Sequence, residues 1–264
     1  MQDAINTIKW TALATLLLSA LSIDRPAFGS PESERMIEVQ HVRLVSHFLQ
    51  TMANKTIKAN AESCALHGMR LPEAPPASII KDVYYTPGAT TIATTNIYYE
   101  ATVDCKLKQR ETHEITAWTS LGACTTKPER NLSAGYCDVD FASLGQFPDQ
   151  KFKRNQTELK GASTMIAGHA CTFYENSAVA SRRVCVARDG AFSKVTNLSF
   201  SDTPLGVILK RESKLAQVST GNSLTEEAIE IHTNVMIPIT TLLPQLSGKY
   251  RVISQKLPPT DSPQ

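Results

Sequence analysis

The sequence predicts an α+β protein that is mainly antiparallel β. We expect a curved or incomplete β-barrel sheet with an N-terminal amphipathic helix packed on it and stapled by disulfides. Three observations predict this class. A helical pattern near the N terminus is followed by a proline-rich connector, and the remainder alternates β-branched and aromatic runs with turn signals. Six cysteines follow a segment that is typical of exported proteins.

The first 29 residues have the layout of a cleavable secretory signal. Lys9 and the amino terminus form a short positive region, and residues 10–23 form an apolar core. Asp24 ends the apolar run too early for the roughly 20 residues that a membrane span needs. We therefore expect cleavage after Gly29 and an exported mature chain, periplasmic or secreted, with no transmembrane segment.

The length and charge of the mature chain favour one β-rich domain, which we place at residues 30–255. The proline-rich residues 256–264 read as a disordered tail. Lys and Arg number 27 against 25 Asp and Glu, so the formal charge is only +2. Nucleic acid binding needs a clustered basic face, and this balance therefore excludes a nucleic acid partner from our expectations. The sequence does not indicate an oligomeric state.

Residues 31–69 show the clearest helical pattern, with Ser30 and Pro31 suited to its start. Apolar residues recur there at spacings of three and four and form one stripe. The stripe residues that we expect on the ligand-facing side of the helix are Val42, Val45, Phe48, Leu49 and Met52. Prolines in the connector at 70–78 end the helical region and lead into the sheet, which we place at 79–255.

The remainder of the chain predicts strands separated by turns. We expect strands near residues 81–86, 93–108, 112–120, 157–167, 169–175, 181–188, 191–199, 205–212, 214–220 and 227–237. Asp189-Gly190 lies between two of these runs and is a strong short signal for a hairpin.

The cysteine count is even, which in an exported protein predicts disulfides. Six cysteines allow 15 pairings. Local spacing favours Cys171–Cys185 and Cys124–Cys137, which leaves Cys64–Cys105 to tie the helix to the sheet.

A disulfide is favoured over the two other uses of these cysteines. A zinc site needs closely spaced ligand pairs and a redox centre needs C-x-x-C, and the sequence contains no C-x-x-C. If Cys171 and Cys185 face each other across a hairpin, Glu175 pairs with Ser181 and residues 176–180 form the loop. We expect neither a metal nor a cofactor.

One short motif could indicate catalysis. Ser78 and Lys81 fit the S-x-x-K pattern of serine acyl-transferring enzymes, in which the lysine activates the serine. The companion motifs are missing, and the pattern leads into a strand, whereas the mechanism places it at the start of a buried helix. We therefore expect a protein that is not an enzyme.

Two segments resemble bacterial envelope proteins of unknown function that have the architecture of the LolA/LolB lipoprotein carriers. Residues 164–195 are similar to a module of paired strands followed by an Asp-Gly turn, and residues 234–253 to a closing strand, a short proline-containing helix and a final strand. This resemblance implies an unclosed antiparallel barrel that wraps helices and shelters an acyl chain. It implies no catalytic residue.

These patterns support two main hypotheses for function. The first is a binding module for a hydrophobic or amphiphilic ligand, sheltered between the N-terminal helix and the sheet. The alternative is a structural or interaction protein of the envelope or extracellular space, with a filled core and an edge strand or loop that contacts an envelope protein. A serine hydrolase using Ser78 and Lys81 is a third hypothesis.

Overall fold

The structure is a computed structural model that describes residues 35–48, 51–75, 77–139, 141, 143–146, 156–176, 182–198, 206–214 and 223–255. The predicted signal segment and the predicted tail lie outside these residues. The elements in chain order, with 3₁₀-helices marked η, are β1 (Met36–Phe48), α2 (Thr51–Leu66), β2 (Ala77–Tyr85), β3 (Ala89–Ala101), β4 (Leu107–Thr119), β5 (Gly122–Lys127), η1 (Pro128–Arg130), β6 (Leu132–Gly135), η2 (Ser143–Gly145), β7 (Gln156–Ile166), β8 (His169–Asn176), β9 (Arg182–Ala187), η3 (Gly190–Lys194), β10 (Val207–Lys214), β11 (Ser223–Pro238), α3 (Ile239–Leu242), η4 (Pro244–Ser247) and β12 (Arg251–Ser254).

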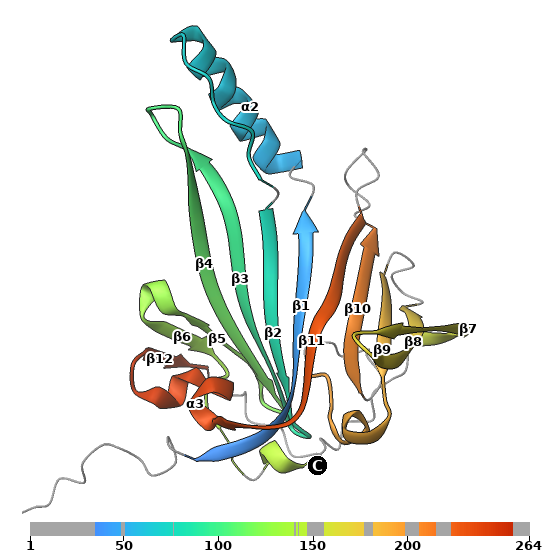
Figure 1. Cartoon of the computed structure of the whole chain (residues 1–264). Helices are drawn as coiled ribbons and strands as arrows, with labels where there is room; N and C mark the ends of the chain where they lie inside the picture. The colour runs from blue at the N-terminus through green and yellow to red at the C-terminus, as the bar shows by residue number, and fades with distance from the viewer. Residues whose placement is uncertain are drawn as a thin grey trace, which may run out of the picture.

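The described strands form one twelve-stranded sheet in the order β12-β6-β5-β4-β3-β2-β1-β11-β10-β9-β8-β7. Neighbouring strands are antiparallel, apart from β12 and β6, which are parallel. The sheet is not closed, and β12 and β7 are its two edges (Figure 1). The predicted class, a mainly antiparallel open sheet with disulfides and few helices, is confirmed.

The central strands carry a separate hydrophobic core on each face, because successive side chains of a strand point to opposite sides. We name the faces after two neighbouring residues of β2, Tyr84 and Tyr85. On the Tyr85 face, side chains of β1 and β2 pack against β7–β10 and η3; they include Val42, Leu44, Val83, Cys171, Cys185, Phe192 and Leu209. On the Tyr84 face, a second core includes Val39, Ala89, Ala117, Ile239, Leu242 and Leu243, so α3 covers this side.

Two consecutive threonines of β3 connect the sheet to these two covering layers. The Thr90 hydroxyl donates to the Thr196 carbonyl oxygen at 2.8 Å and accepts from the Leu198 N–H at 2.9 Å, on the Tyr85 face. The Thr91 hydroxyl donates to the Leu242 carbonyl oxygen at 2.6 Å, on the Tyr84 face. Neighbouring hydroxyls of one strand therefore bind opposite layers of the molecule.

The predicted helix over 31–69 is wrong for its first half. Residues 36–48 form β1, which pairs with both β2 and β11 in the middle of the sheet. Both faces of β1 are covered, since Val39 is 1% exposed in one core and Val42 is 0% exposed in the other. A strand buried on both faces loses the simple apolar–polar alternation, and its apolar spacing then imitates a helical stripe.

The second half of that region is helical, as predicted. Helix α2 spans Thr51–Leu66 and lies at the same end of the sheet as the turn between β3 and β4 (Figure 1). The Cys64–Cys105 disulfide links the helix to this turn. A small cluster surrounds this disulfide, with Leu71 buried and Ile57 half-buried. No helix among the described residues is long and apolar enough to cross a membrane.

Most predicted strands exist, with shifted ends. The strand predicted at 191–199 is wrong, because Gly190–Lys194 form η3 and Phe192 is buried. The hairpin predicted at Asp189-Gly190 is therefore also wrong: a 3₁₀-helix begins at Gly190, where a second strand was expected. The strand predicted at 214–220 lies outside the described residues, apart from residue 214 at the end of β10.

Besides β1, the strand patterns miss β5 and β6, and β12 is expected only from the resemblance at 234–253. Strand β5 has six residues and β6 has four, and most of their side chains are small. Short strands of this composition give a weak strand signal in the sequence. The order expected from the resemblance at 234–253 agrees with the structure, where β11 is followed by α3, η4 with Pro244, and β12.

Candidate functional site

Polar side chains gather on the Tyr84 face, at the centre of the sheet. His41 Nε2 lies 2.8 Å from Asp82 Oδ1, and the Arg43 guanidinium binds both Asp82 oxygens, with Nε–Oδ1 2.8 Å and Nη2–Oδ2 3.3 Å. Arg43 also donates to Glu230 at 3.2 Å. Antiparallel register places these residues together, because Arg43 lies opposite Asp82 on β2 and opposite Glu230 on β11.

Aromatic rings form a second part of this cluster. The His41 ring stacks on Tyr84 of β2 with centroids 4.8 Å apart, and on His232 of β11 with centroids 5.6 Å apart. The His41 ring is thus placed between two rings from neighbouring strands. We name the six residues His41, Arg43, Asp82, Tyr84, Glu230 and His232 the central polar cluster.

The charges of the cluster shift its pKa values in directions that favour ion pairing. Burial raises the pKa of Asp82, but hydrogen bonds from His41 and Arg43 outweigh it and hold this pKa below its usual range. The same hydrogen bond to Asp82 raises the pKa of Arg43. Burial raises the pKa of Tyr84, so its phenol stays protonated. Asp82 is therefore ionised, and its carboxylate is stabilised by both His41 and Arg43.

The cluster has part of the chemistry of a catalytic site. A histidine bonded to a carboxylate is the orienting half of a nucleophile-activating triad. The third group is a hydroxyl or thiol within hydrogen-bond reach of the histidine, and among the residues that the structure describes none is bonded to His41. Arg43 also forms an ion pair with Asp82, so the negative charge of Asp82 is already balanced. The geometry fits a structural ion-pair network better than a base.

A second ionic group lies on the Tyr85 face. Glu226 of β11 is 3% exposed and binds both Lys81 of β2 and Arg211 of β10. The distance from Arg211 Nη1 to Glu226 Oε2 is 3.1 Å. These three residues, the buried ionic trio, lie at the end of the core that contains Leu44 and Ala228. Two partly exposed cations bind this one buried carboxylate, so Glu226 is the centre of the trio.

The structure contains the three disulfides that spacing predicts: Cys64–Cys105, Cys124–Cys137 and Cys171–Cys185. The predicted register around the last one is wrong, since Glu175 pairs with Arg183 and not with Ser181. Cys185 lies opposite Phe173, two residues beyond Cys171, so the disulfide joins diagonal neighbours across β8 and β9. The Cα atoms are 5.4 Å apart, which suits a disulfide at this offset.

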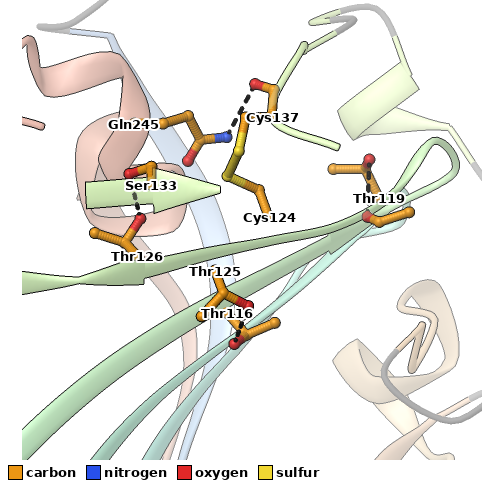
Figure 2. The surroundings of a disulfide bond; sticks show 9 residues. Thr116, Thr119, Cys124, Thr125, Thr126, Ser133, Cys137 and Gln245 are labelled. Atoms are coloured by element: carbon orange, nitrogen blue, oxygen red, sulfur yellow. Dashed lines mark hydrogen bonds between the residues drawn. A yellow bond between two sulfur atoms is a disulfide. The ribbon is translucent and has the colours of Figure 1, made fainter. Parts of the chain in front are cut away.

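The Cys124–Cys137 disulfide fastens the side of the sheet next to β12. Figure 2 shows it beside the buried hydroxyl pair of Thr126 and Ser133, whose oxygens are 2.7 Å apart. Gln245 of η4 approaches the same disulfide and donates to the Cys137 carbonyl oxygen at 3.5 Å. The disulfide and η4 together hold β5, β6 and the last elements of the chain in one unit.

The structure separates Val42 and Val45, the two predicted ligand-facing residues whose side chains it describes. Val42 is fully buried in the core of the Tyr85 face, and Val45 is half-buried on the opposite face of the same strand. The side chains of Phe48 and Met52, and all of Leu49, lie outside the described residues. The predicted helix face is absent from 36–48, because these residues form β1.

The S-x-x-K geometry is wrong for catalysis. Ser78 and Lys81 lie three positions apart on β2, and this odd offset places their side chains on opposite faces of the sheet. Lys81 faces Glu226 in the buried ionic trio, whereas Ser78 shares the Tyr84 face with Asp82. In a helix the same spacing would place both residues on one side.

The open edge at β12 is the exposed surface that stands out from the rest of the sheet. All four residues of β12 are exposed, including Val252 at 44% and Ile253 at 47%. This strand pairs with β6 on one side, and no strand among the described residues lies on its other side. An exposed edge of this kind presents unpaired backbone groups that can pair with another chain.

The fold and this surface define a class: a disulfide-bonded protein built on one open, mainly antiparallel sheet with an exposed edge strand. No protein-family model matches the chain. No curated protein matches it either. A solved structure with similarity to it is the complex of MucA and MucB from Pseudomonas aeruginosa, with a TM-score of 0.31 and 10% sequence identity. The match covers 86% of this chain and 63% of that chain, and likeness at this level carries no argument about function.

Proposed function

We propose that this chain is an exported, non-enzymatic protein-interaction module that binds a polypeptide partner along the open edge of its sheet. The observation that carries the proposal is β12, whose side chains are exposed and whose outer backbone edge meets no other strand in the part of the chain that the structure describes. Extended segments of a partner can add to such an edge by main-chain hydrogen bonds, with side chains on alternate faces giving specificity.

Export is supported by two features that are independent of the sheet. Residues 1–29 have the layout of a secretory signal, and all six cysteines of the mature chain are in disulfides. Disulfides persist in oxidising compartments, which include the periplasm and the extracellular space.

The filled cores favour a protein partner over a sheltered hydrophobic ligand. The Tyr85 face is packed with side chains of β1, β2 and β7–β10. Val42, which the sequence places among ligand contacts, is 0% exposed there. The interaction hypothesis needs only the edge, which is open in this structure.

A photocrosslinking experiment tests the proposal. A benzophenone amino acid replaces Val252 in the mature, oxidised protein, which is isolated after irradiation of the cells that export it. The matched control carries the same group at Ile229 of β11, which is 57% exposed and lies in the middle of the strand order, away from the β12 edge. We expect a defined polypeptide adduct, another copy of this chain included, at 252 and not at 229.

The Ser254→Pro variant makes this result specific for strand addition. Proline at 254 removes an N–H that points away from β6 and so weakens only the outer edge. We expect the adduct at 252 to be lost in this background. The same adducts at both positions, or a bound lipid in native mass spectrometry without an adduct at 252, would show that the proposal is wrong.

A further inference from the structure

The backbone of β12 is arranged so that specific groups are free on its outer side. The Arg251 N–H donates to Asn131 at 2.9 Å, and the Gln255 N–H donates to Gly135 at 2.7 Å, both toward β6. Alternate residues of a strand direct their N–H and C=O groups to opposite sides. Val252 and Ser254 therefore direct their backbone groups away from β6, toward the side on which no described strand lies.

The outward-facing backbone groups of β12 are complementary to the same groups of a second copy of the chain. A twofold axis normal to the sheet brings two copies of β12 together as antiparallel strands and keeps the two faces of the sheet continuous. In the register that sets Ile253 opposite Ile253 of the second copy, Val252 lies opposite Ser254 of that copy. Both residues of this pair direct their backbone groups outward, so each such pair exchanges two hydrogen bonds, and symmetry makes four.

The side chains are compatible with the same register. Ile253, which is 47% exposed, meets its own copy in the non-hydrogen-bonded pair, where side chains approach most closely. Arg251 lies opposite Gln255 of the second copy, so like charges are not opposed. Shifting the centre to Val252 would place Arg251 opposite Ile253 and would leave Ser254 opposite Tyr250, which precedes the strand.

We propose that the partner at this edge is a second copy of the same chain, paired antiparallel through β12 with Ile253 at the centre. This inference rests on the proposed function and names its partner. Four backbone hydrogen bonds and a short apolar contact form a small interface, so the dimer is weak and forms reversibly at high protein concentration.

Single cysteine substitutions in β12 test the proposed register between the two copies. In the Ile253→Cys variant, the two new thiols face each other in a non-hydrogen-bonded pair, whose Cα spacing of about 4.5 Å lies within the range that a disulfide spans. Brief mild oxidation of the concentrated protein should give a covalent dimer on a non-reducing gel. Val252→Cys and Ser254→Cys alone should give little dimer, and a mixture of the two should give a mixed dimer.

Sedimentation of the protein without added cysteines provides the second measurement. Ser254→Pro removes two of the four hydrogen bonds of the dimer and should weaken self-association about thirtyfold. Because the 254 N–H points away from β6, the variant should keep the thermal unfolding temperature of the monomer.

The outcomes separate this inference from the proposed function. A monomer at all concentrations, or equal crosslinking at 252, 253 and 254, overturns the pairing of two copies. If the photocrosslinker at 252 then still captures another polypeptide that Ser254→Pro releases, the edge keeps its interaction function with a different partner. If it captures nothing, both proposals are wrong.

Discussion

Replacing Glu226 by glutamine tests how the sheet tolerates charge in its interior. Glu226 is 3% exposed and is the shared acceptor of Lys81 and Arg211, whose side chains are 20% and 14% exposed. Glutamine keeps the shape but removes the negative charge, so two cations remain close together in a largely buried site. Removal of one partner from a buried ion pair costs about 3–5 kcal/mol.

We expect the lower end of that range, about 3 kcal/mol, since both cations reach some solvent. For a chain of this size, such a loss lowers the melting temperature by about 6–12 °C. The matched control is Glu230→Gln on the same strand, where Glu230 is 45% exposed and pairs with Arg43 on the Tyr84 face. Exposed ion pairs contribute at most about 1 kcal/mol, so this control substitution should change the free energy of unfolding only slightly.

The assay is urea unfolding of both variants with disulfides intact, followed by far-ultraviolet circular dichroism. Lys81→Met provides a further comparison. It leaves one cation with one carboxylate, and should therefore cost less than Glu226→Gln. If Glu226→Gln and Glu230→Gln destabilise the protein equally, the assignment of a buried ionic centre to the Tyr85 face is wrong.

Other predictions address the remaining parts of the structure. Because the pKa of Asp82 is lowered in the folded protein, its stabilising effect is complete above the ordinary aspartate pKa of about 4 and is lost as pH falls through the lowered value. Urea unfolding across pH should therefore show a smaller loss of stability at acid pH in the Asp82→Asn variant. Alanine at both Cys64 and Cys105 removes a disulfide spanning 41 residues and should cost up to about 4 kcal/mol, with hydrogen exchange rising first in α2. Gly135→Ala, at φ +116° with a backbone oxygen 2.3 Å from the added Cβ, should destabilise more than Gly248→Ala, at φ +70° in open space; thermal melts of the two variants compare them.

The sheet could be predicted from the sequence where strands alternate simply. Within β11, half-buried Ile231 and exposed His232 alternate as a strand on the surface of a core should. In β1, by contrast, Val39 and Val42 serve cores on opposite faces, so apolar residues appear at irregular spacings that a helix also fits. The error at β1 arises because its burial on both sides depends on β2 and β11, which lie far away in the chain.

The disulfide pairs were accessible to sequence reasoning, and the polar groups were not. Local spacing is enough to pair Cys124 with Cys137, because only the short η1 separates β5 from its partner β6, and Cys137 follows β6 closely. The central polar cluster needs the register of β1 against β2, which sets His41 opposite Tyr84 and Arg43 opposite Asp82. A weak signal was present, since His41 and Arg43 alternate with Val42 and Leu44, but Val45 ends this alternation after four residues.

The open edge follows from the way the two ends of the sheet are covered. A sheet closes into a barrel when both edges curve toward the same side. Here β7–β10 pack over the Tyr85 face, whereas α3 and η4, which lead into β12, cover the Tyr84 face. Thr90 and Thr91 fasten these layers to opposite sides of one strand. Among the described strands, β7 and β12 are therefore held apart at opposite ends of the sheet and do not pair with each other, which is why the proposed interaction uses the β12 edge.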